Sequence, residues 1–413
     1  MRREDLWVLG RDDESVIADL ALGLGVTPAR VLTYLIRRAT DDRVPEPKAR
    51  QIEIRLGTDL GQQAVVDALS KLKRWELVTE STVESDHGRP PKAWTTEHTV
   101  ETAVRRVYSK RAATLLAEAD ADISGDTSDG GPLRLGLNWH PNGLHVPFYA
   151  ARLEDDYRDQ RIDVEITHHE GSERALQAVT DGDVDVGVVG AATLTRARQQ
   201  GCGVVPIAVL YQRAMTVLYT TRDAFGGPLT GTESLEGRRV GLSPSTETRL
   251  LAELFLLQAG VTDTIEIVET AGEEAAALLS GDADVVAGSF SDPWELQDDH
   301  TVDVLTLSEQ FPMYGPALIV DPTADLDGTR IERFLTATLL GWRAGRRDPE
   351  PAAREIAHRV NGEPAEIERT FGHAIDTFAD SKDRRTHGWG VHEDAEWERM
   401  RTMLTQMRRL DGG

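Results

Sequence analysis

The chain is poor in cysteine, in lysine and in long apolar runs. Its 413 residues include a single cysteine, Cys202, so no disulfide can form within the chain, and six lysines stand against 40 arginines. No apolar run approaches the roughly 18 residues of a membrane-spanning helix, and the first residues lack the apolar segment of a secretory signal. We therefore expect a cytoplasmic protein with no membrane partner. A length of 413 residues also excludes a single small domain.

The charge is distributed unevenly along the chain. Residues 1–110 contain 18 Lys and Arg against 18 Asp and Glu, whereas residues 111–413 contain 28 against 52 and so carry the whole net charge of -24. This asymmetry predicts different partners for the two parts, and only the first part could approach a polyanion. The acidic, arginine-rich composition resembles that of halophilic proteins from high-salt cytoplasms; the alternative is an ordinary acidic protein from a GC-rich genome.

The N-terminal part combines helical patterns with a hairpin pattern. Apolar spacing predicts helices over residues 15–22 and 27–36, which a glycine-containing turn separates, and a third helix over 61–75. Strand patterns follow at 77–82 and 93–96, with a turn between them. We expect a small α+β module.

The turn between these two strands carries the run Gly88-Arg89-Pro90-Pro91-Lys92. With the helices before it, this run resembles the winged helix-turn-helix of prokaryotic transcription regulators and predicts such a domain over residues 1–98. The resemblance implies double-stranded DNA as a partner, with one helix in the major groove and the hairpin tip on phosphates. The alternative is a protein-interaction module, which the zero net charge favours. The candidate DNA-binding residues are Lys71, Lys73, Arg74, Arg89 and Lys92.

Residues 99–131 connect this module to the rest of the chain. An amphipathic helix is predicted over 100–116, followed by a flexible linker at 123–131 that is rich in glycine, serine and aspartate. The helix would either form a homodimer, which suits a two-fold DNA site, or pack on its own chain.

Residues 132–413 alternate short apolar runs with helical stretches, which predicts mainly parallel sheets covered on both faces. The segment 178–187 is repeated at 277–286 with a constant offset, as in Gly182-Asp-Val-Asp-Val against Gly281-Asp-Ala-Asp-Val. Two lobes of one design are therefore expected, the second at about 220–310. Crossing segments near 210–218 and 311–320 would join them around a cleft, where small ligands bind.

The run Asn138-Trp139-His140-Pro141-Asn142 carries a more specific resemblance. Together with the rest of residues 137–151, it resembles the first strand and helix of the thiamine-pyrimidine family, which has the type 2 periplasmic-binding-protein fold. The resemblance implies a cleft for hydroxymethylpyrimidine or a relative. The predicted fold class is α/β with an N-terminal α+β module, that is, a winged helix-turn-helix followed by a two-lobed domain.

The resemblance also supplies candidate ligand contacts. Trp139 would stack on a flat ring, or pack in a lobe core. The carboxylate of Glu295 would accept from an exocyclic amine, or lie in solvent. Hydroxyls before the helix at 246–258 would hold an anionic group, or merely cap the helix. The complete candidate set is Asn138, Trp139, His145, Tyr149, Ser172, Thr193, Ser243, Ser245, Trp294 and Glu295.

Catalytic residues expected of the family's synthase branch are missing. Its cofactor lysine falls at Asp183, its histidine at Thr193, and its cysteine cluster near 313–316, where no cysteine stands. No enzyme activity, cofactor or metal is therefore expected. The sequence predicts a cytoplasmic, ligand-responsive transcription regulator. The alternatives are an enzyme of pyrimidine or thiamine biosynthesis and a regulator that senses another ligand, such as a sulfonate.

Overall fold

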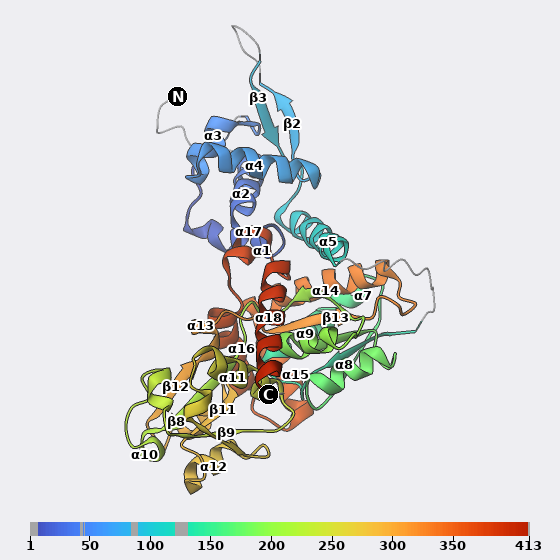
Figure 1. Cartoon of the computed structure of the whole chain (residues 1–413). Coiled ribbons are helices and arrows are strands. Elements are labelled where there is room, and N and C mark those ends of the chain that lie inside the picture. The colour runs from blue at the N-terminus through green and yellow to red at the C-terminus, as the bar shows by residue number, and fades with distance from the viewer. Residues whose placement is uncertain (1–6, 42–43, 45, 84–89, 120–130, 412–413) are drawn as a thin grey trace.

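A computed structural model of the chain shows two α/β lobes and, at the end of the molecule next to the first lobe, a small N-terminal module (Figure 1). The structure describes residues 7–41, 44, 46–83, 90–119 and 131–411, so nearly all of the predicted linker and the Arg89 position lie outside it. No helix among these residues is long and apolar enough to cross a membrane.

The N-terminal module consists of helices and one three-stranded antiparallel sheet with β3 in its centre. Its elements are α1 (Glu14–Leu24), α2 (Val26–Thr40), β1 (Ala49–Arg50), α3 (Gln51–Thr58), α4 (Gln62–Arg74), β2 (Thr79–Thr82) and β3 (Lys92–Thr95). The pattern predicted α1, α2, α4 and the hairpin, but not β1 and α3. Helix α3 has only eight residues, and its Ile52 and Leu56 are each 42% exposed, so it has no clear apolar stripe. Its first turn is held by Glu53, which accepts from the Arg50 N–H at 2.7 Å.

Helix α5 (Val100–Glu118) packs inside its own chain. Thr99 caps its start by accepting from the Thr102 N–H at 3.3 Å. Its apolar side chains, among them Val104, Val107 and Leu115, are fully buried, and α5 contacts α1 on one side and α14 (Gly328–Arg347) on the other. Of the two arrangements open for this helix, the structure therefore shows packing on its own chain.

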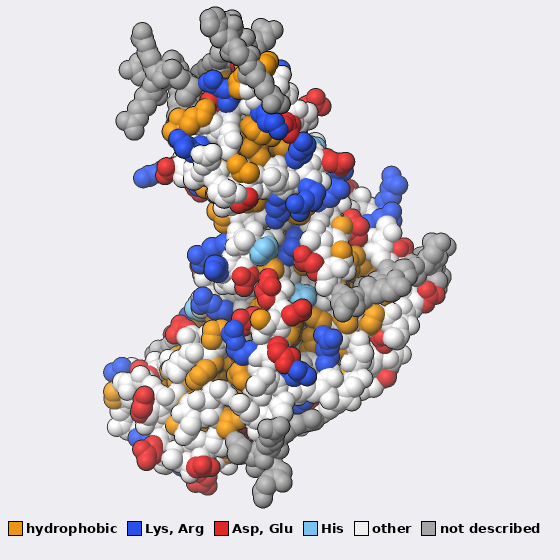
Figure 2. All heavy atoms as spheres, turned by 45° about the horizontal axis from the view of Figure 1, so that its top comes forward, with side chains coloured by type: hydrophobic (Ala, Val, Ile, Leu, Met, Phe, Trp, Pro, Cys, Tyr) orange, Lys and Arg blue, Asp and Glu red, His pale blue; other side chains and the backbone are white. Residues whose placement is uncertain are grey.

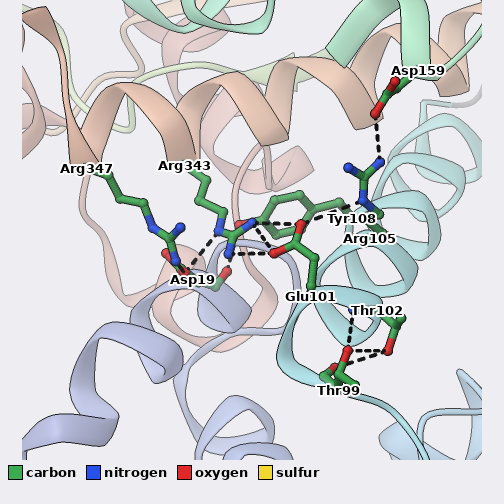
Figure 3. A network of polar contacts seen from close by, with 9 residues as sticks. All are labelled: Asp19, Thr99, Glu101, Thr102, Arg105, Tyr108, Asp159, Arg343 and Arg347. Carbon is green, nitrogen blue, oxygen red and sulfur yellow. Dashed lines mark hydrogen bonds and ion pairs between the residues drawn. The ribbon is translucent and has the colours of Figure 1, made fainter. Parts of the chain in front are cut away.

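A buried ion-pair network joins the N-terminal module to the first lobe (Figure 3). Arg343 of α14 donates to Asp19 of α1 at 3.0 Å and to Glu101 of α5 at 3.0 Å. Arg347 also pairs with Asp19, and the Tyr108 hydroxyl donates to the Asp19 carbonyl at 2.8 Å. Both Arg343 and Asp19 have side chains only 10% exposed. Because breaking a buried pair leaves an uncompensated charge, this network fixes α1 and α5 on α14.

A C-terminal loop adds a second contact at this junction. The Trp389 N–H donates to the Leu22 carbonyl at 2.6 Å, and Arg111 Nε donates to the Trp389 carbonyl at 2.8 Å. The Val209 N–H, at the end of β7, donates to the next residue of the loop, Gly390, at 3.0 Å. The loop therefore links α1 and α5 to a strand of the first lobe. Basic side chains gather on both sides of this junction between the N-terminal module and the first lobe (Figure 2).

Each lobe is built on a five-stranded sheet. The first has the order β5-β4-β6-β13-β7 and the second β10-β9-β11-β8-β12. The first-lobe elements are β4 (Leu133–Leu137), α6 (Val146–Leu153), α7 (Asp156–Asp159), β5 (Val164–His168), α8 (Ser172–Thr180), β6 (Val186–Gly190), α9 (Ala191–Gln199), β7 (Val205–Val209) and β13 (Pro316–Val320). The second-lobe elements are β8 (Thr216–Thr221), α10 (Arg222–Phe225), β9 (Arg239–Leu242), α11 (Glu247–Gln258), β10 (Glu266–Glu269), α12 (Glu274–Ser280), β11 (Val285–Ser289), β12 (Val302–Thr306) and α13 (Leu307–Gln310).

The prediction of mainly parallel sheets holds for four strands of each sheet, but one strand in each is reversed. β13 runs antiparallel to both of its neighbours, β6 and β7, and β8 runs antiparallel to β11 and β12. Each of these strands follows a crossing from the other lobe and inserts in the reverse direction. The sequence pattern did not reveal this, because buried parallel and antiparallel strands have similar apolar runs.

The internal repeat corresponds to the same ion pair in both lobes. Asp185 accepts from the Arg134 N–H at 2.8 Å and from its Nη2 at 2.6 Å. Asp284 accepts from the Arg239 N–H at 2.8 Å and from its Nη2 at 2.7 Å. In each lobe, the aspartate preceding a central strand therefore binds the backbone and the side chain of an arginine in the neighbouring parallel strand, β4 or β9. The expectation of two lobes of one design is confirmed.

The C-terminal helices cover the first lobe and bridge to the second. After α14 come α15 (Glu350–Val360), α16 (Pro364–Phe378), α17 (Lys382–His387) and α18 (Asp394–Asp411). Helix α14 packs along α6, and α18 contacts both α9 of the first lobe and α11 of the second.

We predict that Asp185→Asn will lower the stability of the first lobe by about 1–2 kcal/mol, because a charged acceptor of several hydrogen bonds is lost. Asp155→Asn is the matched control, since Asp155 forms a pair with Arg158 in which the side chains are 58% and 82% exposed; it should change stability by less than about 0.5 kcal/mol. Thermal unfolding monitored by circular dichroism measures both. Equal effects of the two substitutions would contradict the structural role of Asp185.

Candidate functional site: the cleft between the lobes

A cavity of about 710 Å³ lies between the two lobes. The first lobe contributes residues of the β4–α6 connection and the start of α8, and the second contributes the start of α11 and the turn after β11. The two crossing segments line it with residues 214–216 and 314–316. The predicted cleft between lobes is therefore confirmed in position.

Five of the predicted ligand contacts line this cavity. They are Asn138, Trp139, His145, Ser172 and Ser245. Trp139 is 52% exposed, and only the edge of His140 approaches it, at 5.8 Å between ring centroids. Trp139 is therefore not a lobe-core residue, and it can offer an aromatic face to a flat ligand.

His145 and Ser172 are hydrogen-bond donors in the cleft wall. Nδ1 of His145 accepts from the Asn142 N–H at 3.2 Å, which assigns the ring proton of the neutral form to Nε2. Burial, with a smaller effect of His168, lowers the pKa of His145 to about 3, so the ring is neutral at pH 7. Ser172 Oγ accepts from Gly190 at 2.9 Å and from Asn138 at 3.4 Å, so its own proton is free to donate.

Two predicted aromatic contacts lie away from the cleft. Tyr149 is buried in the first lobe, with the guanidinium groups of Arg152 and Arg359 at 4.9 and 5.6 Å from its ring centre. Trp294 packs against Phe290, with Arg369 4.0 Å above its ring. These rings pack against other side chains, outside the cavity lining.

Three predicted polar contacts also lie elsewhere. Glu295 is exposed outside the cavity. The carbonyl of Ser243 accepts from Thr246, which caps α11 by accepting from the Arg249 N–H, so capping is the correct reading at that turn. The Thr193 hydroxyl donates to Glu247 of the opposite lobe, so it supports the cleft rather than lining it.

Asp292 is a lining residue that sequence reasoning missed. It accepts from the Ser289 N–H at 2.8 Å, and burial raises its pKa to about 6. A Cβ at position 288 would lie 2.5 Å from this carboxylate, so Gly288 leaves room for it. The signal in the sequence was the pair Gly288 and Ser289 at the end of β11, with Asp292 three residues further on. Asp292 begins a short 3-10 helix, and Glu295 is exposed on that same helix.

Glu247 is the second missed residue. It is the first residue of α11 in the second lobe, and it accepts from the backbone N–H groups of Ala192 and Thr193 in the first lobe, at 3.0 and 2.9 Å. No local pattern could have indicated this contact, because the partners are more than 50 positions apart in the chain.

The cleft is acidic. Its lining includes the carboxylates of Glu170, Glu173, Glu247 and Asp292, and Arg174 bonds Glu170 at 2.8 Å. Within the described ranges, no group of three or more His, Cys, Asp or Glu side chains is arranged to hold a metal ion.

The basic residues predicted to contact DNA have different surroundings. Lys73 and Lys92 both bond Glu80, at 2.6 and 2.5 Å, and Arg74 is exposed at the end of α4. Lys71 instead donates to the Leu24 carbonyl at 2.8 Å, and burial lowers its pKa to about 8. Lys71 therefore fixes α4 on α1. Arg89 lies outside the described residues.

The two lobes and their cleft define a periplasmic-binding-protein-like fold. The periplasmic aliphatic sulfonate binding protein of Escherichia coli superimposes with a TM-score of 0.52 at 18% identity, over 67% of this chain and 92% of that one. The alkanesulfonate-binding protein of Xanthomonas axonopodis pv. citri, bound to MOPS, gives a TM-score of 0.51 at 16% identity, over 68% of this chain and 95% of that one. Such distant likeness shows the fold alone.

The sequence comparison is more specific. Residues 142–352 match the family described as NMT1/THI5 like, and the chain belongs to this family. The formylaminopyrimidine-binding protein of Halalkalibacterium halodurans is 21% identical over 246 residues, 57% of this chain and 73% of that protein. The 4-amino-5-hydroxymethyl-2-methylpyrimidine phosphate synthase of Candida albicans is 26% identical over 105 residues, 25% of this chain and 30% of that one.

We predict that Asp292→Asn will stabilise the protein near neutral pH. The pKa of Asp292 is raised from 3.8 to about 6, so its contribution to stability is present below about pH 4 and is lost as the pH rises through 6. The substitution should therefore gain about 1–3 kcal/mol at pH 7.5 and almost nothing at pH 4. Melting temperatures at the two pH values measure this, with Asp298→Asn, an exposed carboxylate nearby, as the control. A gain of the same size at both pH values would contradict the assignment.

Proposed function

We propose that this protein is a ligand-responsive transcription regulator, which binds a thiamine-pathway aminopyrimidine between its lobes and duplex DNA with its first 98 residues. The observation that carries the proposal is that one chain combines an NMT1/THI5-like cleft with an N-terminal module of helices and a β2–β3 hairpin, and that the buried Asp19–Arg343 pair joins the two. Hydroxymethylpyrimidine or a close relative is the proposed ligand.

The cleft supports this choice of ligand by its chemistry. A 4-aminopyrimidine is a flat ring with an exocyclic N–H beside an acceptor nitrogen. Trp139 offers it an aromatic face, and Asp292 takes the role first given to Glu295, as a carboxyl group that can accept from the amine. His145 Nε2 and the Ser172 hydroxyl are donors for ring nitrogen or hydroxymethyl oxygen. A related protein is named for binding a formylaminopyrimidine.

The N-terminal module supports DNA binding by its topology. Helix α2, strand β1, helices α3 and α4, and the β2–β3 hairpin follow one another in the order of a winged helix. Only residues 59–61 separate α3 from α4, as in a helix-turn-helix. Lys73 and Arg74 are exposed near the end of α4, the candidate recognition helix, where they could contact backbone phosphates.

The proposal also includes a cytoplasmic location, because the DNA would be there, and a homodimer, because two modules suit a two-fold site. Since the apolar side of α5 is covered within the chain, the dimer interface would lie elsewhere. We propose no catalytic step: Asp183 and Thr193 stand where the resemblance places the synthase lysine and histidine, and neither side chain can form a Schiff base.

We predict that isothermal titration calorimetry of the full chain with hydroxymethylpyrimidine will show saturable binding at one site. Asp292→Asn should weaken it at least tenfold, because the amine then faces an amide instead of a carboxylate. Ser243→Ala, outside the cavity on the same lobe, is the control and should leave the affinity within twofold. Absence of binding, or equal affinities of the wild type and Asp292→Asn, would contradict the proposed site.

We predict that the full chain will retain a specific subset of sheared genomic DNA, which sequencing of the bound fragments identifies. Arg74→Gln should then weaken binding to a retained duplex by roughly three- to tenfold and reduce its salt dependence, as expected for a phosphate contact. Arg158→Gln removes the same charge from the first lobe, at a side chain 82% exposed, and should have no such effect. A chain that retains no fragment above background would argue for a protein-interaction module.

A further inference from the structure

Glu247 joins the two lobes at the edge of the cleft. Its carboxylate accepts from the Ala192 N–H at 3.0 Å, from the Thr193 N–H at 2.9 Å and from the Thr193 hydroxyl. These donors belong to the first turn of α9 in the first lobe, whereas Glu247 is itself the first residue of α11 in the second. The N-terminal ends of two helices, nine and twelve residues long, therefore meet at one carboxylate.

Helix N-termini are favourable places for negative charge, because their first N–H groups have no partner within the helix and the helix dipole is positive there. In many proteins such an end binds the phosphate, sulfate or carboxylate of a ligand. Here the end of α9 has no capping side chain of its own, and Glu247 supplies a carboxyl group from the opposite lobe. Burial raises the pKa of this carboxyl group, while the hydrogen bonds from Thr193 and Ala192 favour its charged form. Gly190 makes this possible, since a Cβ at that position would overlap the Glu247 side chain.

The other residues that line the cleft offer little positive charge to pair with an anionic ligand. Arg174 is bonded to Glu170, and Asp292 adds a further carboxyl group. The imidazole of His145 has a pKa of about 3 because of its burial, and therefore carries no charge at pH 7. An anionic group that entered the cleft would have to displace Glu247 or lie close to it. Among the described lining residues it would find no unpaired cation to offset its charge.

We propose that Glu247 is the residue that selects ligand charge: it fills the anion-binding position at the start of α9, so the cleft accepts an uncharged or cationic ring and rejects phosphate esters and sulfonates. The identity of the ring rests on the proposed function, whereas the charge selection rests on Glu247. The proposal therefore names the free aminopyrimidine, not its phosphate, as the ligand. It also distinguishes this cleft from those of the sulfonate-binding proteins that share its fold.

Calorimetry on the full chain at one fixed ionic strength tests the proposal with four probes: hydroxymethylpyrimidine, its monophosphate, inorganic phosphate and taurine. The wild type should bind hydroxymethylpyrimidine at least tenfold more tightly than the monophosphate, and should bind neither inorganic phosphate nor taurine measurably. Glu247→Gln should reduce the ratio of the two pyrimidine affinities at least fivefold, mainly by improving the monophosphate.

Two further variants separate charge from lobe contact. Thr193→Val removes the hydroxyl bond to Glu247 but keeps the carboxylate, and should leave the ratio within threefold. Glu253→Gln removes the same charge further along α11, where Glu253 bonds Arg249 at 2.7 Å outside the cavity, and should leave the ratio unchanged.

A wild type that binds the monophosphate as tightly as the free pyrimidine would overturn the proposal, even if Glu247→Gln did not fold. A folded Glu247→Gln with the wild-type ratio would overturn it as well. If neither pyrimidine binds, the proposed ligand is wrong; measurable binding of inorganic phosphate or taurine by the wild type would separately overturn the role of Glu247.

Discussion

The burial of one guanidinium group between two carboxylates determines how the two parts of this chain are arranged. Arg343 on α14 bonds Asp19 of α1 and Glu101 of α5; the side chains of Arg343 and Asp19 are buried, whereas that of Glu101 is 53% exposed. Removing one partner from such a cluster typically costs about 3–5 kcal/mol, because the remaining charge stays buried. Since α1 also packs on α2, the position of the N-terminal module relative to the lobes depends on this contact.

The same helix connects the junction with the cleft. Helix α14 packs against α6, and α6 begins directly after His145, which lines the cavity. A second connection runs from Leu22 through the loop at Trp389 and Gly390 to the end of β7, where the chain crosses between the lobes. Two sets of packed contacts, through α14 and through this loop, therefore connect the lobes to the N-terminal module. Continuous packing becomes coupling only where the ligand favours one arrangement of the lobes over another.

The parts of the site that sequence reasoning could predict are local. Asn138, Trp139 and His145 lie in one short run after the first strand, and the repeat of Asp185 at Asp284 indicated the second lobe. The site residues that sequence reasoning missed or misplaced depend on how the helices and lobes are arranged in space. One turn of a 3-10 helix places Asp292 inside and Glu295 outside, and Glu247 meets α9 only because the lobes fold against each other. Lys71 has the spacing of a recognition-helix cation but turns to the Leu24 carbonyl, because α1 packs there.

The central claim is that one chain couples a pyrimidine cleft to DNA, and its most direct test is the affinity for hydroxymethylpyrimidine measured with and without a saturating bound duplex. The account predicts two different affinities, and the same factor for the effect of the pyrimidine on DNA binding, because linkage is reciprocal. Asp19→Asn weakens the junction, so in this variant the ratio of the pyrimidine affinities with and without DNA should move toward one. Equal pyrimidine affinities for the free and the DNA-bound wild type would contradict the account.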